Sequence, residues 1–331
     1  MTDSPILRGM QAPDIRPATP DELDACAAIW RTAINEYLVR LNQHEVPDDL
    51  VGITKLYQHT RATDPDRFLV ATRSEPTDDE PDRERIVGFI SAVERGSLWF
   101  LSMLFVLPEE QASGVGRQLL ERALPDPARG MTLGTATDSA QPISNALYSR
   151  YGMVPRMPLL DLTGELRRPK RLPSLPDGVT ATPFEDVVGE ATGADGAGHR
   201  ELAAIVNRLD RETLGAEHPQ EHAWMRTTER RGFLFRSSGG DVLGYGYGSP
   251  VGRIGPVAVA DSALLAPVIA YLMRTVPARG AFAVWTPGHA GETVRTLLDA
   301  GLRLEPFPIL LCWSGAITDY TRYIPISPGL L

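Results

Sequence analysis

The chain has 331 residues, of which 43% are hydrophobic, and its formal net charge is −9 at pH 7. This length suggests about two domains, and the hydrophobic content is sufficient for packed cores. Because acidic residues outnumber Lys and Arg, nucleic acid is not expected as a partner.

The two longest apolar runs, residues 98–107 and 263–273, are shorter than the roughly twenty residues that a membrane-spanning helix needs. The N-terminus has no signal-peptide pattern, so we expect a cytoplasmic protein without a membrane partner. Cys26 and Cys312 are the two cysteines. A disulfide framework and a thiolate metal cluster are therefore not expected, and both thiols are predicted to lie in cores.

The first half alternates strand and helix patterns. The predicted elements are a strand from Asp14, a helix over 21–37, a hairpin of strands 68–72 and 86–93, a central strand over 98–107, a helix ending at Leu124 and a strand over 131–137. The charged, proline-containing segment between the hairpin strands is predicted to be a solvated loop.

The second half repeats this pattern after a segment rich in Pro and Arg. Val179-Thr-Ala-Thr-Pro183 resembles Arg16-Pro-Ala-Thr-Pro20, and similar strands and helices follow. Internal duplication is the simplest explanation. We therefore divide the chain into a first domain over 1–162, a linker over 163–178 and a second domain over 179–331.

A glycine motif, Gln111-Ala-Ser-Gly114-Val-Gly116-Arg117, joins the central strand to the following helix. The amides of a helix's first turn attract anions, and glycines let a ligand approach the backbone closely. The motif lacks the Gly-Lys-Ser/Thr of a phosphate loop and the position of a dinucleotide fingerprint. By themselves the glycines also fit an ordinary turn, but their place after a strand favours a diphosphate site.

The motif resembles the coenzyme A segment of the GNAT N-acetyltransferase superfamily, Gln/Arg-x-x-Gly-x-Gly/Ala, with Ala112 at a position where Gly is common. A second segment, residues 141–153, resembles the family's Asn-x-x-Ala-x-x-Leu-Tyr-x-x-x-Gly-Phe helix, with Gln141 and Ser144 as departures. Tyr148 stands at the family's tyrosine. The order of predicted elements is also that of the family.

This resemblance implies an α/β (α+β mixed sheet) fold with two tandem GNAT-like domains. In the second domain the glycine pair is absent, Asp261 stands at the helix start, and Leu297 stands where Tyr148 stands in the first. A carboxylate there would repel a diphosphate. We therefore expect the second domain to be a degenerate copy that retains the hydrophobic pattern without the chemistry.

The resemblance also implies acetyl-CoA as co-substrate and an N-acetyltransferase that moves the acetyl group to a primary amine by direct attack. Tyr148 would protonate the leaving thiolate as general acid. The strand backbone would bind pantetheine and the oxyanion. The implied acetyl-CoA contacts are Leu104, Phe105, Val106, Gln111, Ala112, Ser113, Gly114, Val115, Gly116, Arg117, Gln141 and Asn145. Without the resemblance, Tyr148 would be interpreted as a core residue with a satisfied hydroxyl.

The general base is not determined by the sequence. Glu94 is the nearest carboxylate to the central strand and is our candidate, and Glu36 is another, although both also fit solvated surface positions. A chain of water molecules or the terminal carboxylate of Leu331 would serve equally, since the apolar tail has the composition to fold back.

The segment His218-Pro-Gln-Glu221-His222 fits an H-x-x-E-H zinc pattern. We reject a metal site here, and expect no metal, because the segment lies in the degenerate half and no neighbouring motif supplies a third ligand. His44 and His59 are predicted to be surface residues that could line an acceptor cleft.

Two other functions remain open. One is a non-catalytic acyl-CoA sensor, and the other is an acetyltransferase for an amino sugar or a thiol cofactor. The acceptor is expected to be a small-molecule or peptide amine, and a homodimer is an open alternative.

Overall fold

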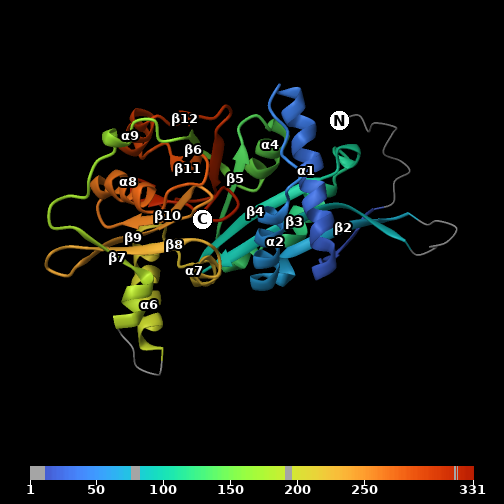
Figure 1. Ribbon diagram of the computed structural model, residues 1–331. Helices are drawn as coiled ribbons and strands as arrows, with labels where there is room; N and C mark the ends of the chain where they lie inside the picture. Colours follow the sequence, from blue (N-terminus) through green and yellow to red (C-terminus); the bar gives the residue numbers. More distant parts are fainter. Residues whose placement is uncertain (1–11, 76–82, 191–195, 317, 319) are drawn as a thin grey trace. The chain divides into compact units, whose positions relative to one another are not determined.

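The computed structural model describes residues 12–75, 83–190, 196–316, 318 and 320–331 (Figure 1). The predicted loop between the hairpin strands lies largely outside the described residues. The protein is a mixed α/β structure with two compact units, Met1–Glu94 with Trp99–Met131 and Arg95–Leu98 with Thr132–Leu331. None of the described helices has the length and apolar character needed to cross a membrane.

The first unit contains a sheet with the strand order β1-β2-β3-β4. Its elements are β1 (Asp14–Pro17), α1 (Leu23–Arg40), α2 (Val51–Thr63), β2 (Phe68–Ser74), β3 (Glu84–Arg95), β4 (Leu98–Val106) and α3 (Val115–Ala123). These positions confirm the predicted first strand, first helix, hairpin, central strand and glycine-motif helix. In Figure 1, α1 and α2 lie over one face of β2 to β4.

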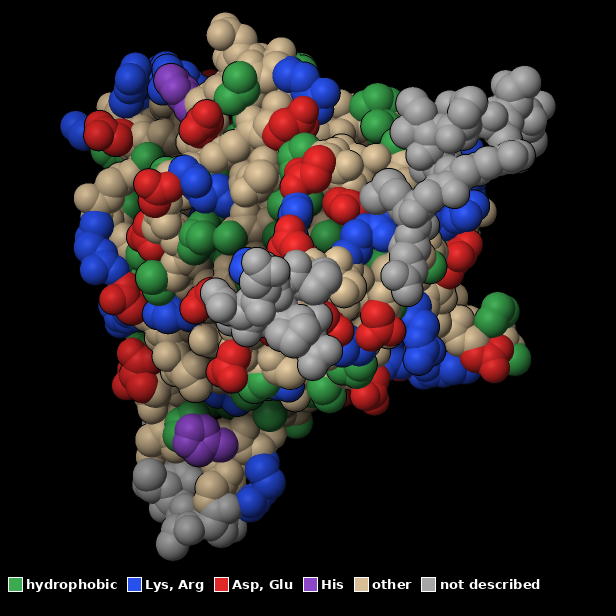
Figure 2. All heavy atoms as spheres, turned by 90° about the vertical axis from the view of Figure 1, so that its right-hand side faces the viewer, with side chains coloured by type: hydrophobic (Ala, Val, Ile, Leu, Met, Phe, Trp, Pro, Cys, Tyr) green, Lys and Arg blue, Asp and Glu red, His purple; other side chains and the backbone are tan. Residues whose placement is uncertain are grey.

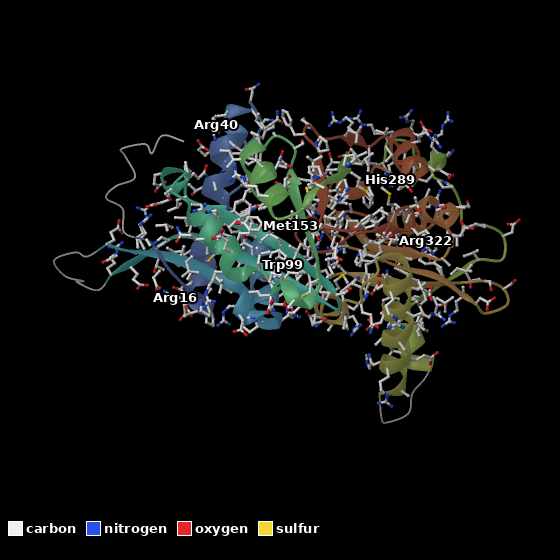
Figure 3. The ribbon with its side chains drawn as sticks, turned by 180° about the vertical axis from the view of Figure 1, so that it is seen from behind. Arg16, Arg40, Trp99, Met153, His289 and Arg322 are labelled. Carbon is white, nitrogen blue, oxygen red and sulfur yellow. The ribbon has the colours of Figure 1, made fainter. Side chains whose placement is uncertain are left out.

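Helix α2 is not among the predicted elements. Its buried residues Leu56, Tyr57 and Thr60 recur at helical spacing, and the Tyr57 ring lies 5.2 Å from that of Phe89 and 5.7 Å from that of Phe68. These aromatic contacts join α2 to β2 and β3. Trp99 on β4 (Figure 3) is fully buried as well, so the predicted central strand has the apolar environment that its sequence requires.

The second unit contains the strand order β5-β13-β6-β11-β10-β9-β8-β7. Its strands are β5 (Thr132–Asp138), β6 (Val154–Gly164), β7 (Thr180–Pro183), β8 (Arg231–Arg236), β9 (Val242–Gly248), β10 (Arg253–Val259), β11 (Phe282–Pro287), β12 (Arg303–Leu304), β13 (Ile309–Trp313) and β14 (Tyr323–Ile324). Its helices are α4 (Pro142–Arg150), α5 (Phe184–Glu190), α6 (Ala197–Thr213), α7 (Pro219–Arg226), α8 (Leu265–Thr275) and α9 (Gly291–Ala300). The second half therefore repeats the order of elements that the first half shows.

The two sequence halves exchange strands within this sheet. Strand β13, from the second half, lies between β5 and β6, pairing Leu311 with Ala136 on one side and Met157 on the other. The far end of β6 pairs with β11, with Leu162 opposite Val284. Each half therefore completes part of the sheet of the other.

This exchange bears on the predicted boundaries. Thr163 and Gly164, which the sequence assigns to the linker, are the last residues of β6. The segment after them is irregular apart from a 3-10 turn at Pro169–Arg171. Because strands of the two sequence halves pair with each other, the compact units do not coincide with residues 1–162 and 179–331. The division of the sequence into two duplicated segments stays a prediction.

The C-terminal tail is part of the second unit. Strand β10 pairs with β11 at Arg253 and Ile254, and further along it pairs with β14 instead. Arg322 (Figure 3) donates to the carbonyl oxygen of Glu212 on α6 at 2.8 Å, and Leu331 is 7% exposed. The tail thus covers β10 where that strand separates from β11.

We predict that a fragment of residues 1–178 does not fold alone. Without β13, strands β5 and β6 would expose unpaired N–H and C=O groups at the centre of the sheet. The fragment should show no cooperative transition in urea, as followed by circular dichroism, and co-expression with residues 179–331 should restore one. A cooperative transition of the fragment by itself would contradict the structural role given to β13.

Candidate functional site

The glycine motif forms a turn between β4 and α3. After the 3-10 turn Pro108–Glu110, Ala112 and Gly114 both have left-handed backbone angles, with φ of 64° and 91°. Gly114 is the residue before the helix, and α3 begins at Val115. The left-handed angle at Gly114 explains why glycine is needed there, whereas Ala112 takes the same region with a Cβ.

Two side chains of the motif hold the turn together. Gln111 Nε2 donates to the carbonyl oxygen of Val106 at 3.1 Å, and Ser113 Oγ donates to that of Glu110 at 2.6 Å. Gln111 therefore bridges the end of β4 and the turn. Both residues were predicted to contact acetyl-CoA, and the structure gives their side chains a role in shaping the turn.

The first turn of α3 has the features of an anion site. Val115, Gly116 and Arg117 are the first three helical residues, whose N–H groups have no carbonyl partner inside the helix. A Cβ on Gly116 would lie 3.6 Å from Val106 Cγ2, so it would fill the notch between strand and helix. The exposed Arg117 adds positive charge to the helix N-terminus.

Two acidic residues next to this turn are neutralised. Glu110 is buried, and its Oε2 lies 2.9 Å from Arg73 Nε, while Glu109 pairs with Arg85. Both arginines come from the hairpin strands β2 and β3. These ion pairs remove the repulsion that two carboxylates beside the helix start would exert on an anion.

The end of β4 is held against its neighbours on the sheet. Leu104, Phe105 and Val106 are half-buried, and the Phe105 ring stacks on that of Phe89 at 5.9 Å. A Cβ on Gly88 would approach the Phe105 carbonyl oxygen to 3.0 Å, so a glycine allows this close contact. The three residues predicted to line the ligand thus lie on a rigid strand.

Glu94, the predicted base, is bound by two arginines. Its oxygens accept hydrogen bonds from Arg129 at 2.7 and 2.9 Å, and it pairs with Arg67 as well. Burial by itself would raise the pKa of Glu94. The hydrogen bonds and charges of Arg129 and Arg67 outweigh this effect and hold the pKa below its usual range. A carboxylate in this state accepts a proton poorly, so its environment does not favour the base role.

Asn145 on α4 has one unsatisfied polar atom. Its Nδ2 donates to the carbonyl oxygens of Asp138 and Gln141 at 3.0 and 2.8 Å, which fixes the orientation of the amide. Its Oδ1 is buried and has no hydrogen-bond partner among the described residues. A buried acceptor of this kind fits a ligand that presents an N–H group. Gln141 is the residue before α4, and its backbone carbonyl oxygen accepts the hydrogen bond from Asn145 Nδ2.

Tyr148 lies one turn further along α4 and is 6% exposed. Burial strongly raises the pKa of Tyr148, as does the Cys312 thiol to a smaller extent, and a hydrogen bond with Ser144 lowers it. The hydroxyl therefore keeps its proton at any physiological pH. Ser144 was noted only as a departure from the family pattern, although its spacing of four residues from Tyr148 indicates contact on a helix.

The predicted histidine and cysteine positions are partly confirmed. Cys26 and Cys312 are buried free thiols, and burial raises the pKa of each to about 12. His44 is exposed, but His59 is 8% exposed on α2, so the prediction that it lies on the surface is wrong. The unpredicted helix α2 turns this histidine inward.

The helix start of the second half differs from that of the first. Asp261 accepts a hydrogen bond from the Ala263 N–H at 2.9 Å, so its carboxylate occupies an amide of the 3-10 turn Ser262–Leu264 that precedes α8. Leu297 lies on α9 and is fully buried, in the same hydrophobic core as the buried residues of α8. These contacts agree with the prediction that the second half has lost both the glycine pair and the tyrosine.

One premise of the sequence analysis is wrong. No third ligand was expected beside His218 and His222, yet Asp210 on α6 lies within ligand distance of both. The sequence could not reveal this because Asp210 belongs to a different helix.

The comparisons with known proteins agree with this description. Residues 64–154 match the family model described as the acetyltransferase (GNAT) domain. No curated protein sequence was found to match.

Solved structures match over nearly the whole chain. An acetyltransferase candidate from Pyrococcus horikoshii is similar over 97% of this chain and 97% of its own, with a TM-score of 0.68 and 16% identity. A GCN5-related N-acetyltransferase from Sphaerobacter thermophilus is similar over 94% and 98%, with a TM-score of 0.57 and 16% identity. The glucosamine N-acetyltransferase region of a fungal multi-domain β-N-acetylglucosaminidase is similar over 92% of this chain and 38% of its own, with a TM-score of 0.57 and 14% identity.

At these identities the structural likeness shows the fold, which is that of GNAT acetyltransferases. The family model matches residues 64–154 alone, and the described elements follow one another in a repeated, tandem order.

We predict opposite effects for two substitutions in the turn. Ala112→Gly should raise the free energy of unfolding by about 0.5–1 kcal/mol, because a left-handed angle strains a residue with a Cβ. Gly114→Ala should lower it by about 1–2 kcal/mol for the same reason. Urea unfolding measures both, and a change of the same sign in the two variants would be inconsistent with the turn described.

Proposed function

We propose that the protein binds acetyl-CoA at the β4–α3 turn and transfers the acetyl group to a primary amine. The observation that carries this proposal is the first turn of α3, where Gly114 and Gly116 open the backbone and neighbouring carboxylates are neutralised by arginines. When bound, acetyl-CoA supplies an acetyl group already activated as a thioester.

The residues present fit such a ligand. The N–H groups of Val115, Gly116 and Arg117 would bind the diphosphate, and the Arg117 guanidinium would add charge. Asn145 Oδ1 would accept from an amide N–H of the ligand, which would satisfy its unpaired buried oxygen. The backbone at Leu104 to Val106 would bind the extended arm and the oxyanion.

Tyr148 would hold the proton for the departing thiolate. Its hydroxyl is protonated, and its hydrogen bond with Ser144 lowers its pKa. In a bond of this kind Ser144 donates to the phenolic oxygen, so the Tyr148 proton remains available for the sulfur. A strongly raised pKa also makes the phenol a weak acid, so its placement would matter more than its acidity.

We propose that the base is a chain of water molecules or the terminal carboxylate of Leu331. Glu94 is bound to arginines, and Glu36 is paired with the exposed Arg40 at 2.6 Å. The lowered pKa of Glu94 does not suit a general base at neutral pH, and the ion pair with Arg40 occupies the Glu36 carboxylate. The terminal carboxylate of Leu331 is the remaining candidate, and deletion of the last three residues with unchanged turnover would exclude it.

We propose that the acceptor is a small-molecule or peptide amine. Figure 2 shows Lys and Arg mixed with Asp and Glu over the face that it presents, so this face offers no patch of one sign to select a strongly charged acceptor. The amine must be neutral when it attacks, which favours amines of low pKa or an alkaline pH.

The cofactor proposal predicts a selective effect of Gly116→Asp. The new Cβ would make only an ordinary contact with Val106, and a carboxylate is favourable in the first turn of a helix, so the free energy of unfolding should not fall. The affinity for coenzyme A should fall about tenfold or more, because the carboxylate would repel the diphosphate.

Isothermal titration calorimetry with coenzyme A measures this affinity. The matched control is Gly52→Asp in the first turn of α2, where a Cβ would have no neighbour within 4 Å and the substitution should leave binding unchanged. If the unaltered protein gives no binding heat at several temperatures, the cofactor assignment is wrong.

The mechanism predicts that Tyr148→Phe lowers kcat by about two to three orders of magnitude and leaves the affinity for coenzyme A unchanged. Because the pKa of Tyr148 is raised, the rate of the unaltered enzyme should not decline on the alkaline side through loss of this proton. Release of free thiol from acetyl-CoA, measured with a panel of amines that includes glucosamine, gives these rates.

Tyr151→Phe, three residues along the chain, is the control and should keep normal kcat. An unchanged kcat in Tyr148→Phe would remove this residue as the acid. The tight pairing of Glu94 with arginines favours a second candidate, a non-catalytic acyl-CoA sensor. That candidate requires coenzyme A binding without thiol release for any amine.

A further inference from the structure

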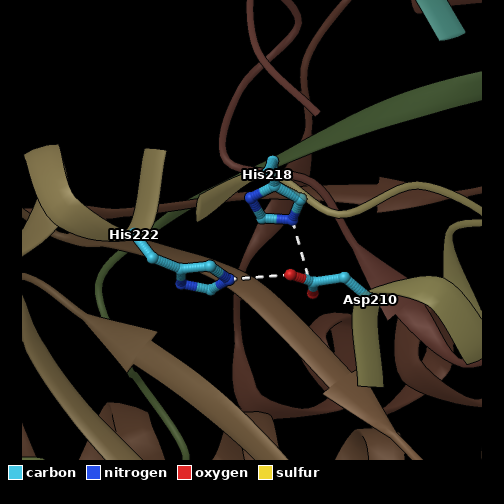
Figure 4. Close-up of side chains that lie close together, drawn as sticks. All are labelled: Asp210, His218 and His222. Carbon is cyan, nitrogen blue, oxygen red and sulfur yellow. Dashed lines mark hydrogen bonds and ion pairs between the residues drawn. The ribbon is translucent and has the colours of Figure 1, made fainter. Parts of the chain in front are cut away.

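Three buried side chains that the proposed reaction does not use converge in the second unit (Figure 4). His218 Nε2 lies 3.3 Å from Asp210 Oδ1, and His222 Nε2 lies 2.8 Å from Asp210 Oδ2. All three residues are at most 2% exposed. Asp210 comes from α6, His218 precedes α7, and His222 lies one turn into α7.

Their arrangement matches what a metal ion requires. One ligand atom from each residue lies within 4.8 Å of the others. A tetrahedral ion with bonds of about 2.0–2.1 Å keeps its ligand atoms roughly 3.3 Å apart. The distances from His218 and His222 to the Asp210 oxygens, 3.3 and 2.8 Å, lie within about half an ångström of this value. Two imidazoles and one carboxylate are ligand types that zinc accepts.

Tyrosine hydroxyls surround these three residues. Tyr247 Oη lies 2.9 Å from His222 Nδ1, which is the ring nitrogen opposite the ligand atom. Metal-binding histidines are commonly held in this way by their second nitrogen. Tyr245 donates to Asp210, and Tyr323 Oη lies 3.0 Å from His218 Nε2, at a place where a fourth ligand would be needed.

The remaining acidic group of the H-x-x-E-H segment does not serve as a base. Glu221 is 1% exposed and forms a bidentate ion pair with the buried Arg95. A hydrolytic zinc centre requires a free glutamate and an open coordination position for water. The cluster has neither feature, so a bound ion would have a structural role.

We propose that Asp210, His218 and His222 form a structural binding site for one zinc ion, with the Tyr323 hydroxyl beside its fourth position. Tyr323 lies on β14, which pairs with β10. The ion would therefore tie together α6, α7 and the C-terminal tail. Thr318 Oγ1 already donates to the Thr213 carbonyl oxygen of α6 at 2.5 Å, in the same stretch of the tail.

Without a metal ion, the same residues would form a hydrogen-bonded cluster in which both imidazoles contact the Asp210 carboxylate. The two alternatives differ in metal content, and this difference does not depend on acetyl transfer. The full-length protein should therefore be incubated with equimolar zinc chloride, desalted, and measured by inductively coupled plasma mass spectrometry.

We expect about one zinc ion per chain. X-ray absorption should show nitrogen and oxygen ligands at about 2.0 Å and no sulfur, which separates this site from binding at the cysteines. Replacement by cobalt(II) should give the visible absorption of a tetrahedral ion. These measurements use the unaltered protein, so they do not depend on whether a variant folds.

The variants His222→Gln and Asp210→Asn should lose the ion. His199→Gln is the matched control, because His199 is exposed on the same helix as Asp210, and it should keep the ion. Absence of zinc after desalting, a sulfur shell in the absorption spectrum, or unchanged zinc in folded His222→Gln protein would each overturn the proposal.

Discussion

The exchange of strands between the two sequence halves is the constraint on which the second unit depends. A β-strand inside a sheet needs partners on both sides, because buried N–H and C=O groups must form hydrogen bonds. Strand β13 supplies those partners to β5 and β6, and the far end of β6 supplies them to β11. The helix that bears Tyr148 lies between β5 and β6 in the chain, so the position of this residue depends on β13, which begins only at Ile309.

The two halves differ at the junction that we propose as the diphosphate site. In the first half, Gly114 precedes α3, which begins at Val115. In the second half, Asp261 caps the corresponding turn and accepts from one of its amides. Strand β14 also covers β10 beyond its pairing with β11. In the second half, Asp261 thus occupies the Ala263 N–H, and β14 occupies backbone groups of β10 with which a ligand would otherwise pair.

Arginine pairing decides which carboxylates are available for chemistry. Glu94, Glu110 and Glu221 are each buried or partly buried, and each is bound by arginine. Pairing offsets the cost of taking a carboxylate out of water. For Glu94, pairing also lowers the pKa and makes the carboxylate a poor proton acceptor. The sequence places these glutamates near functional segments, but their partners come from other strands and helices and cannot be identified from spacing.

The sequence alone determined the features that depend on local order along the chain. Hydrophobic periodicity predicted most strands and helices, and the glycine motif predicted the turn at Gly114, since backbone angle and residue type are coupled locally. Only the tertiary structure decided the register of β13, the burial of His59 and the approach of Asp210 to His218. These results depend on contacts between segments distant in sequence, for which a single sequence carries no local signal.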